Sequence, residues 1–285
     1  TVLRDGRTVG TVPIGETSPD SLVGMMVGRR LGHAIERRRG QPGPARLAVE
    51  DLATATGLSG VSFTLHAGEV LGVYGLLGSG RTELARAIFG ADAIVSGRIR
   101  LDGHEVRPRS PEDARRLGIG FVPEERPQGA FPLRSVRENL TSASPDLIAR
   151  RGWVRPGVER ALAEGMVRAL RIRTPSTETP LARLSGGNQQ KAILGRWLVR
   201  DTPILILDDP TSGIDVGAKD EIYKLIADLT GRGRSVLISS SELTELLALS
   251  DRILVLREGQ VAGILDGDRL TQADVLRLAV RGAVA

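Results

Sequence analysis

The chain contains no cysteine, which excludes disulfides, thiolate metal ligands and a cysteine nucleophile. Aromatic residues make up only 3% of its 285 residues, so stacking platforms for single-stranded nucleic acid are scarce. No apolar run approaches the ~18 residues of a transmembrane helix. The charged start and apolar core of a secretory signal are also missing at the N-terminus. These absences fit a globular protein of the cytoplasm.

Lysine is also scarce, because only three of the 39 basic residues are lysine and the rest are arginine. The net charge is +5 and the isoelectric point is about 10.3. We interpret this modest excess as ordinary solvated charge, and attraction to an anionic membrane surface is the alternative. The hydrophobic fraction of 41% and the charged fraction of 26% are typical of soluble globular proteins. A chain of this length forms one large domain or two small ones.

The beginning of the chain resembles its end. Val2–Arg7 matches Val255–Gln260 in pattern, and Gly10 matches Gly263 at the same offset of 253 residues. Each stretch predicts a strand, a tight turn and a return strand, and each continues into a helical pattern. A chance match between two short hairpins is the alternative.

This internal repeat divides the chain into three parts. Residues 1–36, with the helical pattern Ser21–Leu31, are interpreted as the tail of an earlier copy of the domain. Residues 37–45 form a polar linker rich in proline and glycine. Residues 46–285 form the main domain, which ends in the helical pattern Gln272–Val280.

Strands alternate with helices along the main domain, which predicts a mostly parallel sheet. Alternating or apolar segments predict strands at Leu47–Leu52, Val61–Leu65, Glu69–Tyr74, Gly118–Val122, Pro203–Asp208 and Ser235–Ser239. A further hairpin is predicted near the C-terminus. Periodic segments predict helices at Glu83–Phe89, Asn188–Val199, Ala218–Leu229 and Glu242–Leu249. A longer helical region spans Ser135–Arg173, with breaks at Ser144–Pro145 and Arg155–Gly157.

A glycine-rich turn follows the apolar strand that ends at residue 74. Gly75–Thr82 fits the phosphate-loop pattern G-x-x-x-x-G-K-[ST] at every fixed position except the lysine, which is Arg81. Glycines let backbone N–H groups wrap closely around phosphates, and the following helix aims its N-terminus at the same charge. The residues expected to contact a nucleotide are Gly75, Gly78, Ser79, Gly80, Arg81, Thr82 and Glu83. The Thr82 hydroxyl is also a candidate Mg²⁺ ligand, and a structural glycine turn is the alternative.

Arginine at position 81 has two explanations. One is drift in a lysine-poor protein, and the other is a change of function. Lysine reaches the β and γ phosphates as a compact point charge, whereas arginine is a wider planar fork. Composition explains why the replacement is arginine, but it does not restore the geometry.

Two adjacent carboxylates, Asp208 and Asp209, lie at the end of the apolar strand Pro203–Asp208. At the strand end, Asp208 is placed to hold Mg²⁺, often through water. Asp209 occupies the position where a glutamate would polarise an attacking water. Aspartate is one methylene shorter, and a misplacement of about 1 Å costs on the order of 10²-fold in rate. We therefore expect Asp209 to be a weak general base, with a solvated turn through Pro210–Gly213 as the alternative.

The segment Leu184–Lys191 reads Leu-Ser-Gly-Gly-Asn-Gln-Gln-Lys and ends seventeen residues before Asp208. It resembles the signature motif of ABC transporter ATPases, Leu207–Thr211 resembles their Walker B strand, and Ser212–Asp215 resembles their D-loop. More closely, the arginine-bearing loop Gly75–Glu83, the segment Val122–Arg126 and the signature resemble the second cassette of tandem-cassette importer ATPases for monosaccharides such as ribose and galactose. The similarity covers about residues 46–285, and residues 1–32 resemble the end of the first cassette.

The resemblance implies the α/β fold of a P-loop NTPase ABC cassette. Such a cassette has a mostly parallel sheet core, an antiparallel β subdomain and a helical subdomain, here about residues 134–183. ATP and Mg²⁺ are the implied ligands. The implied partners are a preceding cassette in the same full-length chain, transmembrane permease subunits and, indirectly, a periplasmic-type solute-binding protein. The implied location is peripheral, on the cytoplasmic face of the membrane, with no nucleic acid bound.

The resemblance also shows departures from an active cassette. The Q-loop position holds Glu124 in place of glutamine, and the switch-histidine position, four residues before Glu245, holds Ser241. A hydroxyl cannot replace an imidazole that titrates near neutrality. No aromatic residue between Arg46 and Ser62 is available to stack on adenine.

The signature, by contrast, is nearly intact. In this family two cassettes close head to tail, and each ATP lies between one phosphate loop and the opposite signature. The signature residues expected to face the partner's ATP are Ser185, Gly186, Gly187, Asn188 and Gln189, at the N-terminus of a helix. We therefore expect this chain to complete a partner's hydrolytic site and to turn over little ATP in its own.

Other functions remain open at this stage. A soluble tandem ATPase acting on ribosomes or nucleic acid also lacks membrane spans, although the short linker and scarce aromatics argue against it. A regulatory nucleotide-binding module without a transport role is another alternative. A nucleoside or signalling-sugar importer has a similar second cassette, so the solute is not fixed by this chain. A P-loop kinase is excluded because that class has no need for Leu184–Lys191.

Overall fold

The computed structural model describes residues 1–4, 7–13, 15, 17, 25, 43–267 and 270–281. Apart from Met25, the expected helix Ser21–Leu31 lies outside the described residues, as does most of the expected linker 37–45.

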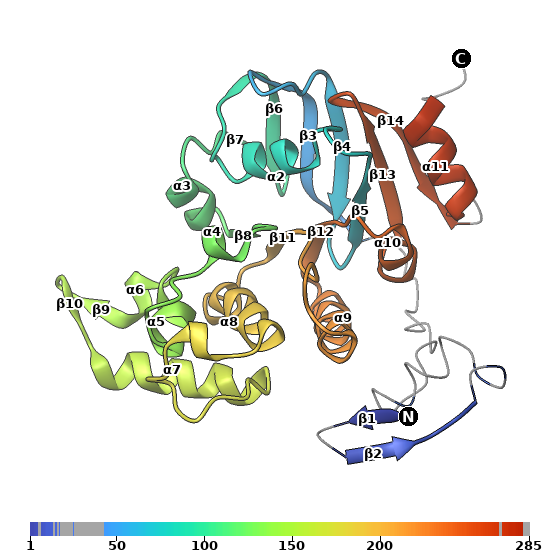
Figure 1. The fold of residues 1–285 in the computed structure, drawn as a ribbon. Coiled ribbons are helices and arrows are strands. Elements are labelled where there is room, and N and C mark those ends of the chain that lie inside the picture. The colour runs from blue at the N-terminus through green and yellow to red at the C-terminus, as the bar shows by residue number, and fades with distance from the viewer. Residues whose placement is uncertain are drawn as a thin grey trace.

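A six-stranded sheet forms the centre of the molecule (Figure 1). Its strands, in spatial order, are β14 (Gln260–Asp266), β13 (Arg252–Arg257), β5 (Val70–Tyr74), β12 (Ser235–Ser239), β11 (Ile204–Asp208) and β8 (Ile119–Val122). All neighbours pair in parallel except β13 and β14, which form an antiparallel hairpin. Every residue of β5, β11 and β12 is buried, as expected for central strands covered on both faces. The predicted mostly parallel sheet is confirmed.

A second, antiparallel sheet packs beside the first. Its strands, in spatial order, are β4 (Val61–His66), β3 (Ala45–Thr54), β6 (Ile94–Leu101) and β7 (His104–Val106). β3 and β4 were predicted from the sequence, whereas β6 and β7 were not. Half of β6 is exposed, and its apolar alternation is confined to Arg98–Leu101, so the sequence signal for this strand is short. The turn Asp102-Gly103, a typical hairpin signal, was the feature that could have revealed the pair.

Helices flank the central sheet (Figure 1). They are α2 (Arg81–Ile88), α3 (Pro111–Arg116), α8 (Gly186–Val199), α9 (Val216–Gly231), α10 (Leu243–Leu249) and α11 (Gln272–Arg281). All were predicted within two residues at each end except α3, which was missed. The Ser110 hydroxyl accepts a hydrogen bond from the Asp113 N–H and Pro111 occupies the first turn, so α3 begins at an ordinary capping sequence.

The helical subdomain lies between β8 and α8 in the chain. Its elements are α4 (Arg126–Gly129), α5 (Val136–Thr141), α6 (Pro145–Ile148), β9 (Ala149–Arg150), β10 (Trp153–Val154), α7 (Pro156–Ala169) and a 3₁₀ turn at Leu181–Arg183. The expected breaks are confirmed, because α6 and α7 each begin at a proline. The small hairpin of β9 and β10 was not predicted. A separate apolar cluster forms the core of the helical subdomain. The cluster includes Leu184 and Ala192, which lie beyond the expected limit of the subdomain at residue 183.

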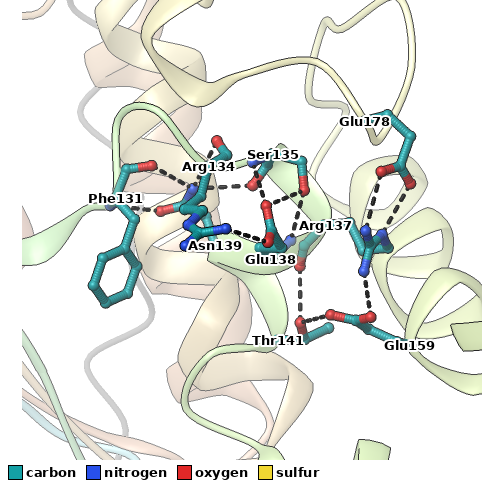
Figure 2. Close-up of polar contacts among 9 residues, drawn as sticks. All are labelled: Phe131, Arg134, Ser135, Arg137, Glu138, Asn139, Thr141, Glu159 and Glu178. Atoms are coloured by element: carbon teal, nitrogen blue, oxygen red, sulfur yellow. Dashed lines mark hydrogen bonds and ion pairs between the residues drawn. The ribbon is translucent and has the colours of Figure 1, made fainter. Parts of the chain in front are cut away.

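The side chain of Asn139 forms hydrogen bonds with the backbone of the turn that precedes α5 (Figure 2). Its side-chain oxygen accepts a hydrogen bond from the Phe131 N–H at 2.8 Å. Its amide nitrogen lies within hydrogen-bond distance of the carbonyl oxygens of Phe131, Arg134 and Ser135, at 2.9, 3.3 and 3.0 Å. Because Asn139 is fully buried, its amide group holds the turn before α5 closed without help from water.

Replacing Asn139 with alanine is expected to lower the free energy of unfolding by about 3 kcal/mol, since several buried backbone groups lose their partners. Urea denaturation of both proteins measures the change. The matched control is Ser142→Ala, which removes one exposed hydroxyl that donates to the Asn139 carbonyl oxygen. The control is expected to shift stability by less than about 0.5 kcal/mol. Equal effects of the two substitutions would contradict the role given to Asn139.

The N-terminal hairpin has the same irregularity as the C-terminal one. β1 (Val2–Arg4) pairs antiparallel with β2 (Arg7–Gly10), and its register shifts between Val2 and Leu3. In the C-terminal hairpin the register shifts between Val255 and Leu256. These positions correspond at the offset of 253 residues, so the two hairpins share a register and a bulge as well as a sequence pattern.

Candidate functional site

The glycine-rich turn connects β5 to α2, as predicted. Gly80 caps α2 in a left-handed conformation with φ of 101°, and Gly78 has φ of 77°. A Cβ atom on Gly75 would lie 2.2 Å from the Ser79 Oγ and 2.6 Å from the Leu256 carbonyl oxygen. Side chains at these positions would strain or crowd the loop. The turn is therefore packed tightly against the Ser79 side chain and β13, so glycine is required at Gly75.

Three buried polar atoms at this end of the sheet have no hydrogen-bond partner among the described residues. They are the Ser79 Oγ, the Arg81 Nη1 and the Asp208 Oδ2. A buried polar atom without a partner costs free energy, so such atoms normally indicate an absent ligand, ion or water. A hydroxyl and a guanidinium suit phosphate oxygens, and a carboxylate oxygen suits a cation. The donor set therefore fits a nucleotide phosphate with a divalent cation.

Asp208 ends β11 beside this turn and is 3% exposed. Burial raises the pKa of its carboxyl, while hydrogen bonds from the Ser239 and Thr82 hydroxyls and the charge of Arg81 oppose that rise. The same contacts place Asp208 next to Thr82. The structure thus brings the two predicted metal-binding residues together.

Asp209 is held in an unusual backbone conformation, with φ of 44°. It is 6% exposed, and its carboxylate oxygen Oδ2 accepts a hydrogen bond from the Ser241 N–H at 2.9 Å. Its own N–H donates to the Ser239 carbonyl oxygen at 2.9 Å. Asp209, at the expected general-base position, and Ser241, at the expected switch position, are therefore in direct contact. The Asp209 carboxylate is hydrogen-bonded to the backbone.

Glu124 lies on the exposed segment after β8. Partial burial and the charges of Asp208 and Asp209 raise its pKa, and Arg81 lowers it. The electrostatic coupling of these four residues shows that the structure gathers the expected Q-loop, Walker B and phosphate-loop positions at one end of the sheet.

Glu245 is a buried residue of the site for which the sequence analysis predicted no role. Its two carboxylate oxygens accept hydrogen bonds from the Thr211 hydroxyl, at 2.7 Å, and from the Ser240 hydroxyl. The Tyr223 hydroxyl adds a third hydrogen bond, and burial raises the pKa of Glu245. A glutamate inside the apolar helix Leu243–Leu249 was the available signal. Through these hydrogen bonds the Glu245 carboxyl links Thr211 after β11, Ser240 after β12 and Tyr223 on α9.

The signature segment forms the N-terminus of α8. Ser185 caps the helix and is exposed, and its hydroxyl oxygen accepts a hydrogen bond from the Asn188 amide at 2.9 Å. Gly187 is buried, and a Cβ there would lie 2.4 Å from the Cβ of Ala218 on α9. The Gln189 amide donates to the Leu184 carbonyl oxygen at 2.8 Å. Gly186 and Gly187 lie in the first turn, where backbone N–H groups lack intrahelical partners.

Replacing Asp208 with asparagine is expected to stabilise the ligand-free protein at neutral pH. The raised pKa of Asp208 means that its stabilising contribution is complete below the ordinary aspartate pKa and is lost as pH rises through the folded-state pKa. Asparagine keeps an acceptor for Ser239 and removes the charge. We expect a gain of about 1 kcal/mol near neutral pH, of the size typical when functional-site strain is removed. The gain should shrink toward pH ~4.

Urea denaturation at several pH values measures this change, with Asp266→Asn as a control at an exposed carboxylate. A gain for Asp208→Asn that grows as pH falls would contradict the assignment.

Within the described part of the chain, no helix combines the length and hydrophobicity that crossing a membrane requires.

Comparison with known proteins agrees with this geometry. A family model described as ABC transporter matches residues 58–212, which is more than half of the chain. The chain therefore belongs to the ABC transporter family.

Among curated proteins, it is 45% identical to the ribose import ATP-binding protein RbsA of Chromobacterium violaceum, over 99% of this chain and 57% of that protein. It is 48% identical to a putative ribose/galactose/methyl galactoside import ATP-binding protein of Pseudomonas fluorescens, over 98% of this chain and 54% of that protein. The chain thus spans just over half the length of these relatives, and it is related to ribose and galactose import ATP-binding proteins.

Solved structures confirm the expected cassette fold. A nucleotide-free ATP-binding cassette from an ABC transporter superposes with a TM-score of 0.70 at 22% identity, covering 81% of this chain and 95% of that one. The dimeric cassette MJ0796, bound to ADP and Pi, superposes with a TM-score of 0.66 at 22% identity, covering 77% and 98%. At this identity the likeness establishes the fold.

Proposed function

We propose that this chain is an ATP-binding cassette of an importer for a monosaccharide or similar solute. The support is its family and its relation to proteins named as ribose and putative ribose/galactose/methyl galactoside import ATP-binding proteins. Its partners would be transmembrane permease subunits and, through them, a solute-binding protein. The chain would then lie peripherally on the cytoplasmic face of the membrane. The solute would contact those partners and not this chain.

The nucleotide would be held mainly through its phosphates. Gly75, Gly78, Ser79, Gly80 and Arg81 supply the backbone cradle and the buried donors, with Glu83 in the first turn of α2. Thr82 and Asp208 would hold Mg²⁺, which would offset phosphate charge. Among the described residues, no three acidic or histidine side chains gather into a metal site. The remaining ligands of such an ion would therefore come from phosphate and water.

The cassette's own site would bind ATP and turn it over slowly. One observation carries this proposal: the Asp209 carboxylate accepts a hydrogen bond from the Ser241 N–H, where an active site needs a free base and an imidazole. Arg81 changes the charge geometry at the phosphates, and Glu124 adds a negative charge at the Q-loop position. Each change removes a group suited to transition-state stabilisation and leaves the phosphate cradle in place.

The intact signature would serve a second cassette. The N-terminus of α8 is suited to an anionic phosphate group. It is formed by Ser185, Gly186, Gly187, Asn188 and Gln189, all of them exposed or half-exposed except the buried Gly187. The shared bulge of the N-terminal and C-terminal hairpins supports an earlier cassette whose tail is residues 1–36. The chain's coverage of just over half of its relatives agrees with that arrangement.

The test is equilibrium binding of ATP to this chain, followed by reconstitution of the full-length protein with its permease. The proposal expects Mg²⁺-dependent binding of one ATP per chain and solute-stimulated ATP turnover in the reconstituted complex. Absence of ATP binding would refute the nucleotide site. Binding without any response to the permease would refute the importer role.

A further inference from the structure

The hairpin of β9 and β10 exposes an aromatic residue at its tip. Trp153 is 81% exposed, and its neighbour Val154 is 51% exposed. The chain has only two tryptophans, and the other, Trp197, is 6% exposed and donates its indole N–H to the Phe121 carbonyl oxygen. An exposed indole leaves a large apolar area in water, so it commonly marks a contact surface.

The hairpin is built rigidly enough to present this side chain. Its two-residue turn places Arg151 and Gly152 at φ of 51° and 81°, the conformation that matches the twist of a tight hairpin. Trp153 pairs with Arg150 across the strands, so their side chains lie on the same face. The Arg155 N–H and guanidinium donate to the Ile148 and Leu147 carbonyl oxygens, both at 2.8 Å, and close the base of the hairpin.

Three exposed arginines lie within three residues of Trp153 in the chain. Among the described residues, Arg150, Arg151 and Arg155 form no ion pair with a carboxylate, whereas arginines elsewhere commonly do so. Arg115, for example, pairs with Glu112 and Asp146. Guanidinium groups without a carboxylate partner, near an exposed indole in the chain, create a surface that is both cationic and apolar. The complementary surface is anionic at its rim and apolar beneath.

We propose that the hairpin Ala149–Val154 docks on an anionic lipid surface, with Trp153 at the headgroup boundary and Arg150 and Arg151 on lipid phosphates. Tryptophan favours that boundary, because its ring is apolar and its N–H is polar. Arginine binds phosphate oxygens through paired N–H groups. The inference rests on the proposed function only in placing the cassette next to a membrane.

Flotation of the purified chain with vesicles of phosphatidylcholine, with and without phosphatidylglycerol, tests the proposal. We expect binding only to the anionic vesicles and weaker binding as salt is raised. Arg150→Gln with Arg151→Gln should lower the partition coefficient about 30-fold, since each basic residue near an anionic surface contributes about fivefold. Trp153→Ala should lower it about tenfold. The matched control, Arg98→Gln with Arg109→Gln, removes the same charge from exposed positions on β6 and in the segment before α3, and should change binding little.

Tryptophan fluorescence gives a second readout from the same samples. The Trp153 emission should shift to shorter wavelength on anionic vesicles, and the shift should vanish in Trp153→Ala, where the buried Trp197 is the sole tryptophan. Equal losses in the control pair would overturn the proposal, since net charge alone would then explain binding. So would a failure to bind lipid vesicles while permease-containing membranes recruit the chain through Trp153, which would assign the hairpin to a permease segment. ATP binding, measured separately, tests the proposed function itself.

Discussion

Replacing Ser185 with alanine in the full-length protein is expected to lower ATP turnover about 100-fold. Ser185 is the N-cap residue of α8, its hydroxyl makes no capping hydrogen bond to the helix backbone, and the Asn188 amide donates a hydrogen bond to it. Loss of one preorganised donor to a developing anion typically costs 10²- to 10³-fold in rate. If the signature completes the partner's hydrolytic site, this loss appears in the turnover of the whole protein. Steady-state phosphate release measures it, with Ser176→Ala as a control at an exposed serine outside the signature.

The proposed function is asymmetric, because the partner's site hydrolyses ATP and this chain's own site turns over little. This asymmetry requires the opposite result at Asp209. Asp209→Ala is expected to change full-length turnover by less than about twofold, a change below 0.5 kcal/mol in barrier height. Because Asp209 is buried and accepts from the Ser241 N–H, Asp209→Asn serves as the variant that keeps this acceptor. A complete loss of turnover in Asp209→Asn, with folding intact, would show that this site hydrolyses ATP and would refute the asymmetry.

Replacing Arg81 with alanine is expected to weaken ATP binding by this chain about 10- to 100-fold. The Arg81 Nη1 is buried and has no partner among the described residues, so it is free to donate to phosphate. A hydrogen bond to a charged group contributes about 1.5–3 kcal/mol. Arg81→Lys should retain most of the affinity, because a cation remains at the phosphates. Titration calorimetry measures both variants.

Arg86 provides the matched control for this effect. It lies on the same helix and is ion-paired with Asp92 at 2.9 Å, away from the glycine turn. Arg86→Ala should lower stability slightly and leave ATP affinity within about twofold, since a half-exposed ion pair contributes about 1 kcal/mol or less. Equal losses of affinity in Arg81→Ala and Arg86→Ala would mean that Arg81 does not contact nucleotide.

The strongest sequence predictions were local ones. The order strand, glycine turn and helix at Gly75–Thr82 follows from short-range rules, as does the apolar strand that ends at Asp208. Prolines 145 and 156 begin helices where the breaks were expected. The parallel sheet followed from the alternation of strands and helices. Apart from the sheet, a few neighbouring residues determine the conformation in each case.

The contacts between distant segments could not be predicted in this way. The hydrogen bond from Ser241 to Asp209 spans 32 residues, and the Thr211–Glu245 hydrogen bond spans 34. Both depend on the order of β11 and β12 in the sheet, which no single segment encodes. β6 was missed because its periodic signal is confined to Arg98–Leu101, and the small hairpin at Trp153 has too few residues to show one.

The most direct test of the account is ATP binding and turnover by this chain alone, measured beside the full-length protein. The account predicts Mg²⁺-dependent binding of one ATP per chain, with turnover at most about one hundredth of the full-length rate, as expected when the general base and switch groups are both compromised. Turnover by the isolated chain at a rate comparable to that of the full-length protein, abolished by Asp209→Asn, would contradict it.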